Sequence, residues 1–219
     1  MKHKLSSQEK LKKRSLDLAY IAICVALISV CSWISIPAYV PFTLQTFAVF
    51  FTLIILGGKR GTIAILSYLL LGLCGAPVFA NFNGGIAGFV NFSSGYLISF
   101  LFMGLFYWPF SIIFKEKIIA QIIGLTFGLI ICYTLGTIFF IFLYTSRVKE
   151  ITLVSALSMC VFPFIPFDIL KMALAIIIAN VLKKYMPNLK KKKKVIINDI
   201  NENNADNVDI KKEEDNLDS

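Results

Sequence analysis

The chain has 219 residues, of which 57% are hydrophobic and 16% are charged, and its formal net charge is +9. Residues 61–114 and 118–146 contain no charged side chain. Each run is longer than the about 20 residues that a helix needs to cross a bilayer core. The basic residues collect in the two terminal segments and in short loops, which excludes a folded nucleic-acid-binding module. We therefore expect an all-α integral membrane protein embedded in the lipid bilayer.

Hydropathy divides the chain into three parts. Residues 1–15 form a basic segment, which we expect to be cytoplasmic. Residues 186–219 are rich in Lys, Asn, Asp and Glu, and we expect a charged, disordered cytoplasmic tail. Between them, residues 16–185 are expected to be a six-helix membrane domain. Its predicted transmembrane helices are residues 16–36, 43–56, 62–73, 94–114, 118–144 and 166–185.

The loop charges predict the orientation of these six helices. Lys and Arg precede the first helix, follow the last one, and occur in the second and fourth loops. Cytoplasmic loops carry the excess of basic residues in membrane proteins. Both termini are therefore expected inside the cell, although the fifth loop carries a small mixed cluster of charges. Residues 37–45, 77–96 and 166–171 then share the outer side.

Two opposite charges interrupt the last apolar segment. Asp168 and Lys171 are three residues apart, so they lie on the same side of a helix. Charged side chains inside a membrane are energetically costly, and they usually face a cavity and mark a functional site. We therefore interpret the pair as the polar floor of a binding site. The alternative interpretation is a purely structural ion pair at the helix end.

Further polar and aromatic candidates lie in the other two outer segments. Thr43 and Gln45 stand at the start of the second predicted helix, where they either cap the helix or bind a polar ligand. The segment 74–96 is long, uncharged and rich in Gly, Asn, Ser and Phe, and loops of this length are more often functional than connecting. Its candidate ligand-binding residues are Phe79, Asn81, Phe82, Gly85 and Tyr96.

Small residues recur along the first predicted helix. Ala19, Ala22, Ala26 and Ser29 follow helical spacing, and small residues on one face let two helices approach closely. This face either packs within the protein or docks on a partner membrane protein. The five cysteines form no CxxC motif, and no predicted helix contains a histidine. We therefore expect no metal site, no cofactor and no catalytic group.

Six segments together resemble the BioY family of biotin transporters. They read VPFTLQT (40–46), LGGKRG (56–61), SYLLLGLCGAPVFA (67–80), NGGIAG (83–88), SGYLISF (94–100) and PFIPFDILKMALA (163–175). The order and spacing of these motifs resemble the family over residues 16–184. Members are substrate-binding S components of energy-coupling factor (ECF) transporters. The resemblance implies an S-component bundle and, as partners, a transmembrane coupling protein and two ATPase subunits.

The resemblance also implies roles for the candidate residues. Asp168 would accept hydrogen bonds from the ureido N–H groups of biotin, and Lys171 would pair with its carboxylate. Thr43, Gln45 or an asparagine would donate to the ureido oxygen, and Phe79, Phe82 and Tyr96 would cover the apolar parts. Because Asp168 and the ligand carboxylate compete for one lysine, backbone N–H groups of the glycine loop or a protonated Asp168 would relieve the competition.

The expected function is high-affinity biotin binding and uptake across the cytoplasmic membrane, with ATP used by the partner subunits only. The Ala22-x-x-x-Ala26 pair resembles the motif with which S components dock on the coupling protein. One alternative is an S component for another vitamin, such as thiamine or riboflavin. The other is an intramembrane enzyme that uses Asp168 as general acid or base, which lacks a second catalytic group in the sequence.

Overall fold

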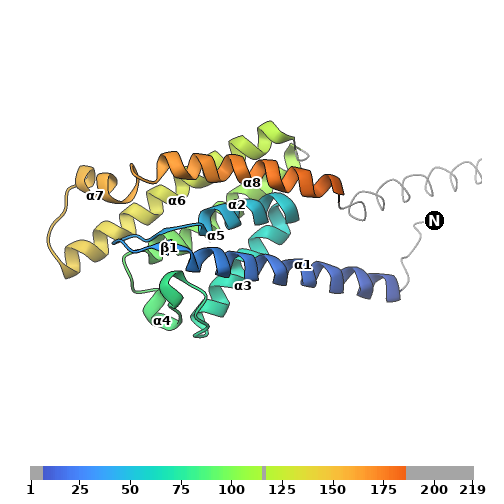
Figure 1. The fold of residues 1–219 in the computed structure, drawn as a ribbon, viewed down its shortest axis with the longest axis horizontal. Helices are drawn as coiled ribbons and strands as arrows, with labels where there is room; N and C mark the ends of the chain where they lie inside the picture. Colours follow the sequence, from blue (N-terminus) through green and yellow to red (C-terminus); the bar gives the residue numbers. More distant parts are fainter. Residues whose placement is uncertain (1–6, 115–116, 186–219) are drawn as a thin grey trace, which may run out of the picture. The chain divides into compact units, whose positions relative to one another are not determined.

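The computed structural model describes residues 7–114 and 117–185. The predictions made for residues 1–6, 115–116 and 186–219, including the disordered tail, lie outside the described residues. Helices dominate the fold (Figure 1). In chain order the elements are α1 (Ser7–Trp33), β1 (Ser35–Ile36), β2 (Phe42–Thr43), α2 (Gln45–Leu56), α3 (Gly58–Leu73), the 3-10 turn η1 (Ala80–Phe82), α4 (Gly85–Gly88), α5 (Ser94–Ile113), α6 (Ile118–Arg147), α7 (Leu153–Cys160) and α8 (Ile165–Tyr185).

The chain divides into two units. Met1–Ala179 form one compact unit and Asn180–Ser219 form the other, of which the structure describes only the end of α8. All of the features discussed below lie in the first unit.

Four of the described helices are long and apolar enough to cross a membrane. They are α5, α6, α8 and the part of α1 from Arg14 to Trp33. The second and third predicted helices are present as α2 and α3, but they have only 12 and 16 residues. At a rise of about 1.5 Å per residue, a helix as short as α2 covers little more than half of the bilayer core. The all-helical prediction is confirmed, and α2 and α3 are shorter than a full span.

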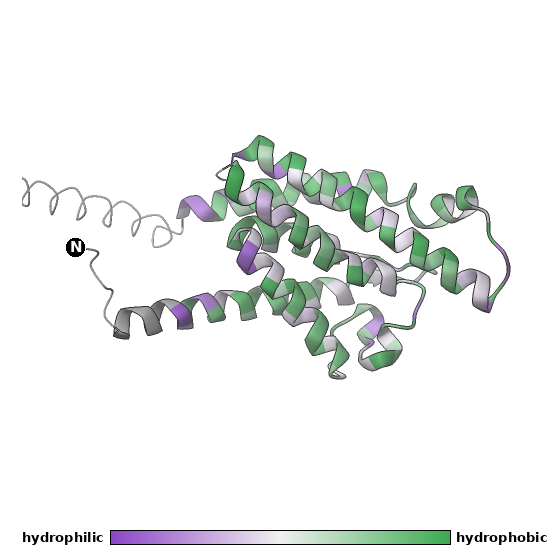
Figure 2. Ribbon diagram, turned by 180° about the vertical axis from the view of Figure 1, so that it is seen from behind, coloured by the Kyte–Doolittle hydropathy of each residue, from purple (hydrophilic) through white to green (hydrophobic). Residues whose placement is uncertain are grey.

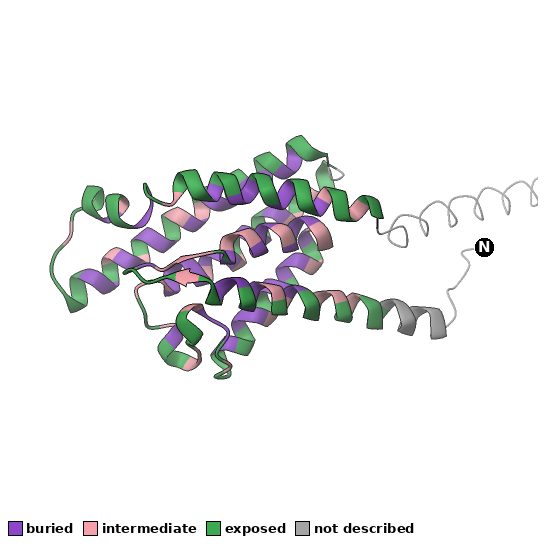
Figure 3. Cartoon of the chain, viewed as in Figure 1, coloured by how far each residue is buried: buried purple, intermediate pink, exposed green. Residues whose placement is uncertain are grey.

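Apolar side chains cover the outward faces of the helices. Figure 2 shows hydrophobic residues all around the helices, and Figure 3 shows that burial is confined to their inward-facing stripes. Phe142 and Ile177, for example, remain 69% and 60% exposed. Water would make such a surface unfavourable, whereas lipid tails accommodate it. The exposed surface is therefore that of a membrane-embedded protein.

Helices α5 and α6 approach closely because glycines face bulky side chains across their interface. A methyl group on Gly136 would overlap the Tyr96 ring, and one on Gly128 would overlap Met103. Both partners are buried, Tyr96 at 8% exposure and Met103 at 0%. The two glycines therefore set the distance between the helices, and they leave room for Tyr96 to lie against α6.

The last turn of α1 holds the segment that follows α3. Trp33 Nε1 donates a hydrogen bond to the Pro77 carbonyl oxygen at 2.8 Å, and its ring stacks on Phe82 at a centroid distance of 5.0 Å. Ser35 Oγ donates to Asn81 Oδ1 at 3.0 Å. From Ser35 onward, β1 pairs with β2 as an antiparallel hairpin. Two of the three outer segments are thus fixed to the end of α1.

Replacing Gly136 with alanine is expected to destabilise the fold. Although alanine favours a helix over glycine by about 1 kcal/mol, overpacking against a rigid aromatic ring costs about 1–3 kcal/mol. We expect a lower thermal unfolding temperature in detergent for Gly136→Ala. The matched control is Thr134→Ala on the exposed face of α6, where the hydroxyl bonds only to the Ile130 carbonyl of its own helix. An unfolding temperature for Gly136→Ala equal to that of Thr134→Ala would contradict the close approach.

Candidate functional site

A cavity of about 670 Å³ lies where the three predicted outer segments meet. This volume is within the usual range for small-molecule sites, about 300–1,000 Å³. Its lining comes from the β1–β2 hairpin and the start of α2, from the segment between α3 and α5, and from α5 to α8. Seven of the nine predicted ligand-binding residues line it: Thr43, Gln45, Phe79, Asn81, Tyr96, Asp168 and Lys171.

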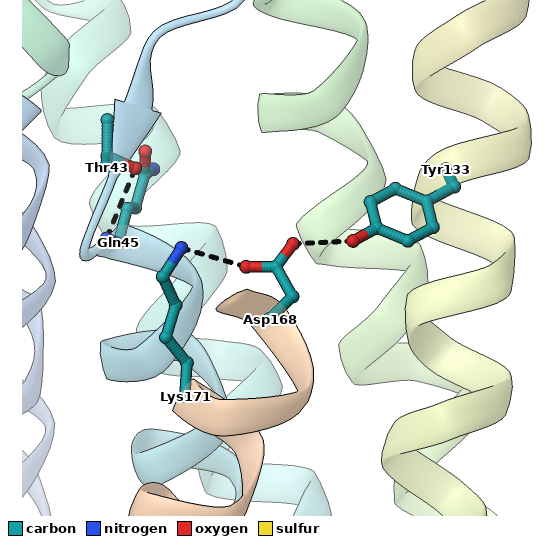
Figure 4. Close-up of polar contacts among 5 residues, drawn as sticks. All are labelled: Thr43, Gln45, Tyr133, Asp168 and Lys171. Carbon is teal, nitrogen blue, oxygen red and sulfur yellow. Dashed lines mark hydrogen bonds and ion pairs between the residues drawn. The ribbon is translucent and has the colours of Figure 1, made fainter. Parts of the chain in front are cut away.

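The charged pair at the start of α8 is buried and engaged. Asp168 and Lys171 are only 3% and 5% exposed. Lys171 Nζ lies 2.9 Å from Asp168 Oδ1, and the Tyr133 hydroxyl donates to Asp168 Oδ2 at 2.7 Å. Figure 4 shows the resulting row, with the carboxylate between the ammonium group and the phenol of α6. Both carboxylate oxygens therefore act as acceptors before any ligand is considered.

An aromatic ring provides the second contact of the lysine. Lys171 Nζ lies 4.2 Å from the centroid of the Phe42 ring, a distance at which the ring quadrupole attracts a cation. Phe42 is held in turn by Phe167, in an edge contact at 5.0 Å, and by Phe164 at 5.7 Å. Burying two charges is costly unless they are paired and hydrogen-bonded. Phe42 and Tyr133 supply the contacts that the i, i+3 pair alone lacks.

Helix α8 begins at Ile165, immediately before a proline. Pro166 is the second residue of the helix, a position where its missing N–H is not needed by the helix. The Asp168 backbone N–H donates to the Phe164 carbonyl at 2.8 Å. Asp168 and Lys171 consequently stand in the first two turns, where the helix meets the cavity. The predicted start near Pro166 agrees with this geometry.

A chain of hydrogen bonds lies behind Gln45. The Gln45 backbone N–H donates to Thr43 Oγ1 at 3.2 Å. Thr43 belongs to β2, and Leu44 takes the N-cap position without a side-chain cap, so the predicted N-cap was one residue too early. Gln45 Nε2 donates to the Tyr68 hydroxyl at 3.0 Å. The Tyr68 hydroxyl donates to the Val78 carbonyl at 3.1 Å. Gln45 is thus 4% exposed and held from the protein side.

Aromatic rings form much of the apolar wall. Phe79 is 2% exposed and makes edge contacts with Tyr68 at 5.5 Å and with Phe89 at 5.3 Å. The Tyr96 hydroxyl shares a hydrogen bond with Thr137 Oγ1 at 3.0 Å, which leaves its ring to line the cavity. These rings offer flat apolar surfaces next to the charged row.

Two predicted residues lie outside the cavity lining. Phe82 is 63% exposed and stacks on Trp33, so its ring serves to fasten the loop. Gly85 has a φ of +69°, a left-handed conformation that glycine adopts without strain. It begins the short helix α4. In this structure both residues shape the loop, and neither lines the cavity.

Three residues of the site were not predicted from the sequence. Tyr133 lies in the middle of the long apolar helix α6, Phe42 lies in the hairpin, and Tyr68 lies in α3. A tyrosine within an apolar run usually seeks a partner for its hydroxyl when buried. That signal could have indicated Tyr133 and Tyr68. Phe42 has no comparable signal, because its role depends on where the hairpin places its ring.

The small-residue face of α1 points away from the rest of the protein. Ala19, Ala22 and Ala26 are exposed, whereas Ser29 is buried at 6% exposure. Near this face, Asp17 pairs with Arg60 of α3 at 2.9 Å. The three alanines are therefore not used for packing within the described part of the chain. They form a surface of small side chains on the face of α1 that points away from the other helices.

Comparison with known proteins places the chain in a family. A family model described as the BioY family matches residues 1–188. The biotin transporter BioY of Thermotoga maritima is 42% identical over 77% of this chain and 96% of its own length. The probable biotin transporter BioY of Pyrococcus horikoshii is 35% identical over 75% of this chain and 94% of its own.

A solved structure resembles the fold as well. The crystal structure of an S-component for biotin from an ECF-type ABC transporter is 30% identical, with a TM-score of 0.69. The similarity covers 83% of this chain and 95% of that chain. Sequence, fold and family match agree over nearly the whole membrane domain, and the chain belongs to the BioY family.

Proposed function

We propose that the chain is the biotin-binding S component of an ECF-type ABC transporter and that the cavity at the start of α8 holds the vitamin. The family is one of transporters, and the fold matches a biotin S-component. The observation that supports the site most directly is the buried row Tyr133–Asp168–Lys171 beside an aromatic wall. This arrangement suits a ligand that has one strongly polar ring and a large apolar surface.

The geometry favours a different division of roles from the one expected by resemblance. Lys171 Nζ and Asp168 Oδ1 are only 2.9 Å apart, so both groups face the same end of a ligand. A cyclic urea presents its C=O beside an N–H, which matches an ammonium donor beside a carboxylate acceptor. In our proposal both residues bind the ureido group. The ligand carboxylate then does not compete with Asp168 for the lysine.

The neutral residues at the other side of the cavity suit the rest of the ligand. Asn81, Asn83 and Asn91 line the cavity within the loop segment, and asparagine amides can donate to a carboxylate. Phe79 and Tyr96 also line the cavity and offer rings to the apolar chain of biotin. We propose this order of contacts from the ureido end to the carboxylate end.

Six membrane-crossing helices with both termini in the cytoplasm remain our proposed topology. It is supported by helices at all six predicted positions and by the meeting of the three outer segments at one cavity. In our proposal the short helices α2 and α3 complete the bundle beside the four full-length spans. The site then opens to the outside of the cell, where the vitamin is captured.

We further propose that the energising partners are a transmembrane coupling protein and two ATPase subunits. The outward-facing alanines of α1 support a docking surface, because small residues let a second helix approach closely. ATP hydrolysis by the partners would supply the energy for release inside the cell. No nucleic acid and no resident cofactor enter this function.

Removing the charged pair should abolish biotin binding and still leave a folded protein. Replacing a buried ion pair with apolar residues of similar size is often neutral or stabilising, whereas removing one partner costs about 3–5 kcal/mol. We expect the double variant Asp168→Leu, Lys171→Met to unfold near the wild-type temperature and to lose biotin binding by more than 100-fold. Isothermal titration of the detergent-solubilised protein, with thiamine and riboflavin as comparison ligands, measures this.

Two outcomes of that titration would contradict the proposal. Retained biotin affinity in the double variant would remove the pair from the site. Saturable binding of thiamine or riboflavin, without binding of biotin, would assign the cavity to another vitamin. Tyr133→Phe is the milder companion variant, and the loss of one charge-assisted hydrogen bond predicts a decrease in affinity of about tenfold or more.

Cysteine labelling can test the topology. In a Cys74→Ser background, which removes the one exposed cysteine, we expect a cysteine at Asn83 to react with a membrane-impermeant maleimide on intact cells. A cysteine at Lys117 should react only after permeabilisation. The reverse pattern would overturn the proposed orientation.

Substitution of the α1 alanines should separate docking from binding. Ala22→Leu and Ala26→Leu add bulk to an exposed surface, so we expect unchanged biotin affinity and at least tenfold less co-purified coupling protein. Ile23→Leu is the matched control, because this neighbouring side chain is 64% exposed and keeps its volume. Normal co-purification by both alanine variants would refute the docking surface.

A further inference from the structure

We infer that Tyr68 is a positioning residue that makes Gln45 a hydrogen-bond acceptor toward the ligand. Gln45 then accepts a hydrogen bond from the ureido N–H that does not bind Asp168. This inference rests on the proposed function and assigns roles that differ from those expected by resemblance. Gln45 was expected to donate to the ureido oxygen. The hydrogen bonds behind its side chain point to the opposite polarity.

The polarity originates at a backbone carbonyl. The Val78 oxygen lies 3.1 Å from the Tyr68 hydroxyl and 2.5 Å from Ser32 Oγ. A carbonyl oxygen only accepts, and Tyr68 donates to this one. The single proton of Ser32 has a second acceptor in the Ser29 carbonyl, at 2.8 Å from Ser32 Oγ, so Val78 draws on the proton of Tyr68. Tyr68 has a single hydroxyl proton. Once it is given to Val78, the phenolic oxygen has only its acceptor capacity left for Gln45.

That constraint orients the amide of Gln45. The group facing the Tyr68 oxygen at 3.0 Å must be a donor, which is Nε2. The assignment of amide oxygen and nitrogen follows from such a network and not from the shape of the side chain. Within the described residues, the Gln45 side chain is hydrogen-bonded through Nε2 and not through Oε1, and the residue lines the cavity. The oxygen is thus available to a ligand.

Burial makes this orientation hard to reverse. Tyr68 is 0% exposed, Ser32 is 0% exposed and Gln45 is 4% exposed. Turning the amide would place Oε1 against an oxygen whose proton already points elsewhere. Water does not reach the Tyr68 hydroxyl to supply a replacement partner. A buried polar group without a partner is more costly than an exposed one, so the relay holds one orientation.

The acceptor completes a pattern at the polar floor. Gln45, Lys171 and Asp168 all line the cavity, and Figure 4 draws Gln45 and Thr43 at the α2 side of the Lys171–Asp168 pair. The three side chains offer a ligand two acceptors and one donor. A cyclic urea presents the complementary set, with two N–H groups and one C=O. The relay through Tyr68 therefore selects ligands with two ring N–H groups flanking a carbonyl, and it discriminates against rings that lack one of them.

Biotin analogues test this assignment. One pair consists of cyclic carbamates in which an oxygen replaces one or the other ureido N–H, and a third analogue carries a thiocarbonyl in place of the ureido carbonyl. For the wild-type protein we expect each carbamate to bind about tenfold or more weakly than biotin, since each loses one hydrogen bond. We call the factor by which an analogue binds more weakly than biotin its penalty. In Gln45→Leu, the penalty of one carbamate should fall to less than twofold, and the penalty of the thiocarbonyl analogue should stay unchanged.

The variant Tyr68→Phe tests whether Tyr68 orients the amide of Gln45. It keeps the ring and releases the amide, so we expect the same carbamate penalty to shrink at least threefold, and no further change when Gln45→Leu is added. Thr62→Val is the matched control, because it removes a buried hydroxyl from the same helix that donates only to the Gly58 carbonyl of α3 and leaves the Tyr68–Gln45 bond in place. Its carbamate penalty should equal that of the wild type. Tyr68→Phe also supplies the answer if Gln45→Leu fails to fold.

The outcomes separate this inference from the proposed function. If the wild-type protein does not bind biotin, the proposed function fails. If it binds biotin but Gln45→Leu and Tyr68→Phe keep the full carbamate penalties, only the acceptor role fails. If Gln45→Leu instead lowers the thiocarbonyl penalty, Gln45 is a donor to the ureido oxygen and the relay is overturned.

Discussion

The cavity of this membrane protein depends on the burial of one lysine beside one aspartate. In an apolar medium neither charge is tolerable alone, so every neighbouring element supplies something to the pair. Helix α6 contributes the Tyr133 hydroxyl, and the hairpin contributes the face of Phe42. The proline at the start of α8 places both charges in its first turns. The polar floor and the packing around it are thus one arrangement, and a ligand meets groups whose positions are already determined.

A second polar system reaches the cavity at Gln45 and is neutral. The hydrogen bonds from Gln45 through Tyr68 to Val78 join α2 and α3 to the loop segment that follows α3. Charges supply strength in this site, because ionised groups make the stronger hydrogen bonds. Neutral groups supply direction, because an amide can face either way until its neighbours decide. Phe79 and Tyr96 line the same cavity and offer apolar surface to the parts of a ligand that carry no polar atoms.

Much of this arrangement could be predicted from the sequence. Uncharged runs indicated the helices, and the isolated pair Asp168–Lys171 indicated the site, because a membrane makes unneeded charges rare. Loop charges brought the three outer segments to one side. Contacts that depend on three-dimensional approach were not visible. Phe42 and Tyr133 are distant in sequence from Asp168, and nothing local distinguishes Phe79, which lines the cavity, from Phe82, which stacks on Trp33. The ends of α2 and α3 at Leu56 and Leu73 agree with the prediction, but α3 begins at Gly58, four residues before the predicted start, because the basic segment 57–61 was interpreted as a turn.

The fastening of the loop to α1 bears on how long a ligand stays. Trp33 and Ser35 hold the loop segment at Pro77 and Asn81, and Ser32 holds it at Val78. If the proposed ligand lies beneath this segment, these bonds must open both for its entry and for its release. Weakening them would then raise the association and dissociation rate constants together, so the end of α1 would set how fast the ligand exchanges and the floor at α8 how tightly it binds.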